Sequence, residues 1–248
     1  MYERDTKTGW SRVYGDNDIE TGGGGGAIDY DTAVRNGFIR KVFGILSIQL
    51  LLTVAISIPI VTVDSISNYI FNNIWVFYLS LGLSFVFLLS LVCCPGAIHS
   101  YPINYVLLFA FTICEGFLVG TISATYDAKS VVLAAGLTLG ITIGLSIFAT
   151  QTKWDFTMIG GILFSILIAM VLSSIIAAFF PASRTFTLIY ASIGAILFSA
   201  YLVYDVQLIA GGRKYEMGVD DYVPAALAVY LDVINIFLFL LRILGNRS

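Results

Sequence analysis

The sequence predicts an all-α membrane protein, a single bundle of seven transmembrane helices. Of its 248 residues, 58% are hydrophobic and only 12% are charged, whereas a soluble domain carries about 25% charged residues. The apolar residues fall into runs of roughly 20, the length that an α-helix needs to cross a bilayer. The connections between these runs are too short to fold as a separate domain.

The expected spans follow a polar N-terminal segment. They cover residues 38–63, 74–94, 103–122, 130–150, 156–180, 186–209 and 222–244. The first 34 residues are polar and glycine-rich, so we expect a disordered tail there and assign residues 35–248 to the membrane domain. Lysine and arginine favour the cytosolic side of membrane proteins. Nine of them lie on the side of the tail and four on the other, which predicts a cytosolic N-terminus.

Composition also disfavours several function classes. A net charge of −3 without a basic stripe gives no signal for binding nucleic acid. Cys93, Cys94 and Cys114 lack the spacing of a disulfide framework or a zinc site, and His99 is the only histidine. We therefore expect no tightly bound cofactor.

Two aspartates inside apolar runs are the main candidates for a functional site. Asp205 lies in the sixth run and Asp232 in the seventh. A carboxylate at the centre of a membrane helix costs about 2.5–3.5 kcal/mol or more, so such residues usually find a partner and a function. Because the connection between the two runs is short, we expect antiparallel neighbours whose aspartates can meet.

Two carboxylates in contact would respond to pH. Both cannot be ionised cheaply, so the pair tends to share one proton. Loss of that proton would push the helices apart or recruit a cation, and carboxylate oxygens suit Ca²⁺. Asp205 and Asp232 are therefore candidates for a pH sensor, a gate and transient Ca²⁺ ligands. A hydrogen-bonded pair that only holds two helices together is the alternative.

Two further polar residues are candidates for an ion pathway. Glu115 lies near the middle of the third run. Asn235 lies one turn after Asp232, on the same helical face. Both would offer oxygen atoms to a passing cation if they face the interior of the bundle.

Glycines recur at every fourth position of the fourth run, at Gly136, Gly140 and Gly144. Small residues at this spacing form a flat surface that lets another helix approach closely. We therefore predict a helix-packing role for them, with a path lined by backbone atoms as the alternative.

An intramembrane aspartyl protease also uses two aspartates. Tyr204 and Asp205 resemble one half of the presenilin-like motif, but residues 229–231 before Asp232 are Val-Tyr-Leu and contain no glycine. Two carboxylates permit acid–base chemistry without specifying it. We therefore expect no enzyme and retain the protease only as an alternative.

Six segments of the chain form recognisable motifs: FIRKVF (38–43), SIQLL (47–51), YPINY (101–105), FAFTICEGFLVG (109–120), YLVYDVQLI (201–209) and DYVPAALAVYLDVINIF (221–237). Together they resemble the transmembrane BAX-inhibitor-motif family, and within it the lifeguard branch. These segments follow in the family's order, and the resemblance covers about residues 35–245.

The resemblance implies a fold with the seventh helix at the centre, wrapped by the other six. It implies that Asp205 and Asp232 form a di-aspartyl sensor controlling a Ca²⁺ leak in the endoplasmic reticulum or Golgi, which lowers stored calcium and restrains cell death. Some members also carry a basic residue near the end of the second helix that latches onto the pair. Residues 91–100 of this sequence contain no lysine or arginine, and a protonated His99 would be the nearest substitute.

The leading hypothesis is a pH-sensitive leak channel in the lipid bilayer, with Ca²⁺ as the permeating ion. The alternative is a non-conducting regulator that binds membrane proteins of death or calcium-release pathways. Only the channel predicts flux from purified protein and dependence of that flux on Asp205 and Asp232.

Overall fold

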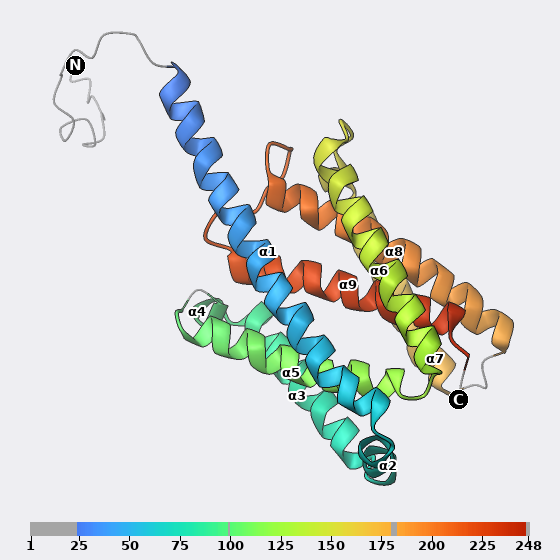
Figure 1. Cartoon of the computed structure of the whole chain (residues 1–248). Helices are drawn as coiled ribbons and strands as arrows, with labels where there is room; N and C mark the ends of the chain where they lie inside the picture. Colours follow the sequence, from blue (N-terminus) through green and yellow to red (C-terminus); the bar gives the residue numbers. More distant parts are fainter. Residues whose placement is uncertain (1–23, 99, 180–182, 247–248) are drawn as a thin grey trace, which may run out of the picture.

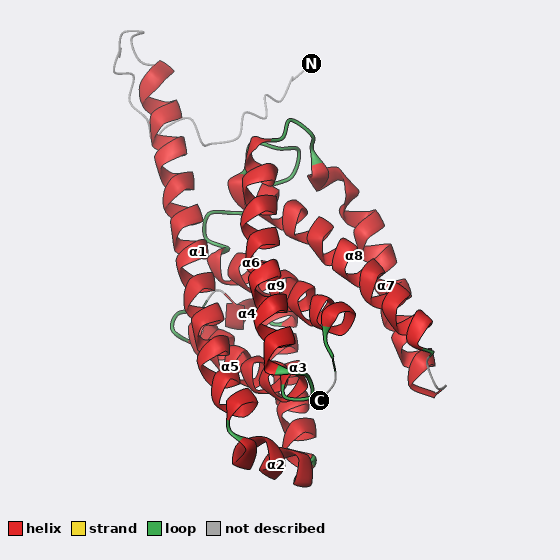
Figure 2. Ribbon diagram, turned by 45° about the vertical axis from the view of Figure 1, so that its right-hand side comes forward, coloured by secondary structure: helices red, strands yellow, loops and turns green. Residues whose placement is uncertain are grey.

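The structure, a computed structural model, describes residues 24–98, 100–179 and 183–246 (Figure 1). In these ranges the chain is helical and contains no strand (Figure 2). The long helices are α1 (Gly24–Thr62), α3 (Trp75–Cys93), α5 (Ile103–Ser123), α6 (Ala128–Gln151), α7 (Gly160–Phe179), α8 (Arg184–Ala210) and α9 (Tyr222–Leu244). The short ones are α2 (Asp64–Asn72), α4 (Pro95–Ile98) and the 3₁₀ turn η1 (Phe156–Ile159).

The predicted all-α membrane fold is confirmed. Seven helices of the described chain are long and apolar enough to cross a bilayer, and their bounds agree with the predicted spans within a few residues, except at the start of the first. Helix α1 begins at Gly24, well before the predicted start at residue 38, and its membrane-span part begins at Thr32. Residues 1–23 of the predicted tail lie outside the described residues.

Two expected connections contain short helices. Helix α2 occupies the connection after the first span, and Asp64 in its first turn suits the positive end of the helix dipole. Helix α4 occupies the connection after the second span. His99, which follows α4, lies outside the described residues.

Helix α9 lies at the centre of the bundle, as expected. It packs against α1, α5, α6 and α8, while α3 packs on α5 and α7 on α8 (Figures 1 and 2). Half of the α9 span is buried inside the protein, compared with 11% of the α3, α6 and α7 spans. The outer helices therefore present most of their apolar surface to lipid.

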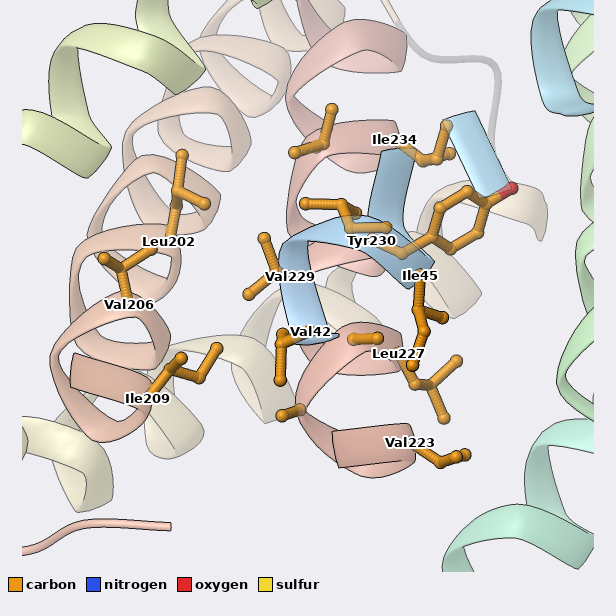
Figure 3. Packing of buried hydrophobic residues seen from close by; sticks show 14 of the residues in the cluster. Val42, Ile45, Leu202, Val206, Ile209, Val223, Leu227, Val229, Tyr230 and Ile234 are labelled. Carbon is orange, nitrogen blue, oxygen red and sulfur yellow. The ribbon is translucent and has the colours of Figure 1, made fainter. Parts of the chain in front are cut away.

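Apolar side chains from six helices, α9 included, pack together at the centre of the bundle. Val42 on α1, Leu202 and Val206 on α8, and Val229 and Tyr230 on α9 are all buried in one cluster (Figure 3). Since lipid is as apolar as these side chains, close packing rather than exclusion from water stabilises the contacts. The cluster therefore fixes how α8 and α9 face each other.

Close helix approach occurs at glycines other than those of the predicted stripe. A Cβ atom on Gly120 would lie 3.0 Å from the Cα of Ser57, so α5 approaches α1 closely there. By contrast, a Cβ on Gly136, Gly140 or Gly144 would meet nothing within 4 Å in the described chain. The packing role of the stripe stays a prediction.

Candidate functional site

The structure brings Asp205 of α8 and Asp232 of α9 together inside the bundle. Their exposed fractions are 8% and 4%, and the two carboxyl groups lie close enough to interact as hydrogen-bonding partners. Because a carboxylate only accepts hydrogen bonds, this contact requires a proton on one of the two groups. The pair could therefore hold one proton between its two groups, as predicted for a pH sensor.

One oxygen of the pair has no protein donor. Oδ2 of Asp232 is buried and finds no hydrogen-bond partner in the described residues. An unsatisfied buried acceptor costs about 1–3 kcal/mol. This oxygen is therefore a place where a water, a proton or a cation would bind favourably.

No cationic side chain neutralises the pair in the described chain. An ion pair of the described chain joins Arg35 to Glu216 and involves neither aspartate. The titratable neighbours that interact electrostatically with Asp205 are the phenols of Tyr201 and Tyr204 on the same helix. An unperturbed phenol titrates near about pH 10, so the charge of the pair near neutral pH depends on its own proton.

Local features of the chain hold α8 and α9 together around the pair. Gly194 of α8 lies against the ring of Phe239, since a Cβ atom there would be 2.5 Å from ring carbons. At the other end, α8 stops at Gly211, whose φ of 73° lies in the left-handed region that favours glycine. The chain then returns to begin α9 at Tyr222.

Glu115 lies at a different interface. Ser84 on α3 donates a hydrogen bond of 2.5 Å to Oε1 of Glu115 on α5. The carboxylate thus faces α3, and its partner is a hydroxyl group. Asn235 donates from Nδ2 to the carbonyl of Leu231 one turn earlier, at 2.8 Å. A pathway role for either residue stays a prediction.

A second buried polar group joins α1, α5 and α9. Gln49 donates to Oγ1 of Thr112 at 3.0 Å, and the hydroxyls of Thr53 and Tyr230 are 2.8 Å apart. Gln49 is completely buried. The sequence analysis did not single out this group, although a glutamine inside the apolar first span was a usable signal.

Hydrogen bonds join the loop after α6 to the end of α8 and to the loop after α8, close in sequence to Asp205. Gln207, two residues after Asp205, donates to the carbonyl of Trp154 at 2.9 Å and accepts from the amide of Phe156 at 2.8 Å. Asp155 accepts from the hydroxyl of Thr157 and from the amide of Lys214. These hydrogen bonds, that of Thr157 foremost, hold the pKa of Asp155 below its usual value.

The fold and the site define a seven-span α-helical membrane protein with a buried acidic pair. The described residues contain no cluster of three or more metal-ligating side chains. A family model described as "Inhibitor of apoptosis-promoting Bax1" matches residues 35–248. The chain therefore belongs to this family, the BAX-inhibitor-motif proteins, whose description names a regulator rather than an enzyme.

Relatives of the lifeguard group are similar over most of the chain. Protein lifeguard 3 of Homo sapiens is 39% identical over 221 residues, which is 88% of this chain and 71% of that protein. The Mus musculus protein of the same name is 38% identical, over 88% and 72% of the two chains. Protein LIFEGUARD 4 of Arabidopsis thaliana is 35% identical, over 94% of this chain and 97% of its own length.

Proposed function

We propose that the protein is a Ca²⁺-permeable leak channel of the endoplasmic reticulum or Golgi, in which Asp205 and Asp232 form a pH-dependent gate. The observation that carries the proposal is the contact between two carboxyl groups buried at the centre of a membrane bundle. Membership of a family described as inhibiting apoptosis supports a role in restraining cell death. Release of stored calcium through the channel would connect ion conduction with the restraint of cell death.

The shared proton keeps the gate closed. With it, the two carboxyl groups hold α8 and α9 together. Without it, two adjacent negative charges repel each other, by about 4 kcal/mol at 4 Å and an effective dielectric constant of 20. The repulsion loosens the contact between the helices, so the leak should increase as pH rises.

Ca²⁺ passes this site without residing in it. Ca²⁺ takes roughly six to eight oxygen ligands, and the pair supplies four carboxylate oxygens at most. Oδ2 of Asp232, one of these oxygens, is buried inside the bundle. The charge distribution predicts that the N-terminus lies in the cytosol. Ca²⁺ would therefore flow from the lumen to the cytosolic side of the membrane, where α1 begins.

The test is Ca²⁺ flux into liposomes that hold the purified protein, from about pH 5.5 to 8. We expect the wild-type flux to rise with pH, and Asp205→Asn and Asp232→Asn to flatten the profile, because neither variant can form a doubly charged pair. Asp64→Asn is the matched control, since it removes a carboxyl group on α2, a helix that does not carry the pair, and should leave the pH profile unchanged.

Three outcomes would contradict the proposal. An unchanged pH profile in both aspartate variants would rule out the pair as the gate. No flux from folded wild-type protein would favour the non-conducting regulator, whose binding to membrane proteins should be insensitive to Asp205 and Asp232. Cleavage of a membrane peptide that is lost with either aspartate would instead indicate a protease.

A further inference from the structure

Arg35 of α1 binds the last turn of α8 and the loop between α8 and α9. Its Nη2 donates to the carbonyl of Leu208 at 2.7 Å, and its Nη1 donates to the carbonyl of Met217 at 2.6 Å. Leu208 lies in the last turn of α8, and Met217 lies shortly before α9. One guanidinium group therefore joins α1 to the last turn of α8 and to the loop before α9, and the α8–α9 connection reaches α1 in Figure 1.

The carbonyl of Leu208 accepts a second hydrogen bond, from the amide of Met217 at 3.0 Å, in addition to that from Arg35. This bond links the last turn of α8 to the loop before α9. A carbonyl in the last turn of a helix has no partner within that helix, and a cation is favourable at this end of the helix dipole. We call this set of three hydrogen bonds among Arg35, Leu208 and Met217 the clasp.

The clasp is shielded from water and lies close to the aspartate pair. The side chain of Arg35 is only 16% exposed, and charge-assisted hydrogen bonds are stronger than neutral ones. Leu208 follows Asp205 by three residues, or roughly 4.5 Å along the helix. Glu216 lies 3.8 Å away and is 56% exposed, so it contributes little to holding the cation.

We propose that Arg35 is a positioning residue of the gate, which holds the end of α8 against the loop that leads into α9 and so sets how readily Asp205 and Asp232 separate. This inference rests on the proposed channel function. The two hydrogen bonds from Arg35 exist only while Leu208 and Met217 stay together. Breaking them removes a restraint on the closed arrangement without touching either aspartate.

Substitutions at two positions, Arg35 and Gly211, disrupt the clasp by different means. Arg35→Gln removes the cation, and Arg35→Lys should have an intermediate effect, because one ammonium group lacks the planar fork that spans two carbonyls. Gly211→Ala displaces the guanidinium instead, since a Cβ atom at Gly211 would lie 2.6 Å from its nitrogens.

Each substitution has a matched control. Gly212→Ala introduces the same residue at a φ of 71°, where a Cβ meets nothing within 4 Å. It therefore carries the same backbone strain as Gly211→Ala without the clash. Arg40→Gln removes an exposed arginine of the same helix.

Two measurements on full-length protein test the clasp. Amide hydrogen exchange of residues 208–218 reports the clasp directly and does not depend on conduction. Liposome Ca²⁺ flux at about pH 5.5, where the pair holds its proton, reports the gate. For Arg35→Gln and Gly211→Ala we expect faster exchange and a roughly tenfold higher leak at acid pH, because two charge-assisted hydrogen bonds of the closed state are lost. Both controls should match wild type.

The outcomes separate the clasp from the channel. Unchanged exchange in both variants would overturn the clasp. Faster exchange with unchanged flux, in a wild-type protein that conducts, would make Arg35 merely structural and overturn its gating role. A wild-type protein that does not conduct would show that the proposed function itself fails, and the gating role of Arg35 fails with it.

Discussion

The two acidic sites inside the bundle differ in what faces the acid. Between α5 and α3, Glu115 faces a hydroxyl group, and Ser84 donates to it at 2.5 Å. Between α8 and α9, Asp205 faces a second carboxyl group, that of Asp232. A serine hydroxyl donates whether or not the acid is charged, but a carboxyl group donates only while it holds a proton.

The difference indicates that the partner of a buried acid, more than its depth, decides whether a helix contact depends on pH. The Ser84 contact survives ionisation of Glu115 and is strengthened by it. The contact between Asp205 and Asp232 is lost when their shared proton leaves. Only the second interface can therefore act as a pH-dependent joint between helices.

The largest effect is expected when the pair is converted to the type of contact found at Glu115. Asp232→Ser leaves a hydroxyl group facing Asp205, so the contact no longer depends on a shared proton. We expect the rise in Ca²⁺ flux between about pH 5.5 and 8 to become roughly tenfold smaller. The reason is that the variant lacks the buried hydrogen bond that depends on a proton. Ala228→Ser, one turn earlier on the same face, is the control, and full pH dependence in Asp232→Ser would contradict the comparison.

A smaller effect is expected from the reverse change at the other interface. Ser84→Asp places a second carboxyl group beside Glu115, and two such groups resist double ionisation. Unfolding in detergent should then become pH-dependent, with the variant about 1–3 kcal/mol less stable at neutral than at acid pH. Ser84→Asn has a similar shape without the charge, so its stability should not vary in this way. A flat profile for Ser84→Asp would argue against the role given to the partner.

The smallest effect is expected at Asp155, an acid outside the spans. Its pKa is lowered by hydrogen bonds from Thr157 and Lys214, so its contribution to stability is present above its unfolded pKa of about 3.9 and is lost as pH falls through the lower folded value. Asp155→Asn should therefore reduce the melting temperature slightly and equally from about pH 5 to 8, with the difference disappearing only below about pH 4. A change in the flux profile near neutral pH would show that the loop, and not only the pair, senses protons.

The spans could be predicted from the sequence because each depends on local composition. A run of about 20 apolar residues must be helical in lipid, where every backbone polar group needs a partner within its own segment. Helices α2 and α4 were missed because they are short and lie in connections. The start of α1 at Gly24 was missed because glycine-rich sequence has low helix propensity.

The candidate site could be predicted only in part. Asp205 and Asp232 stand out as charges in apolar runs, and a short connection makes their helices neighbours. The orientation of Glu115 toward Ser84 could not be predicted, since 31 residues separate the two. The contacts of Arg35 with Leu208 and Met217 join residues 173 and 182 positions apart.

The sequence by itself determined the seven spans, the pair of buried acids and the family, because hydrophobic length, buried charge and motif order can each be seen along the chain. Only the tertiary structure decided which partners these residues have. Gly120 and Gly140 have similar neighbours along the chain, yet α1 packs on Gly120 and nothing in the described chain packs on Gly140. The rotation of each helix about its own axis determines which residues of the neighbouring helices it contacts. That rotation is set by how all the side chains pack together.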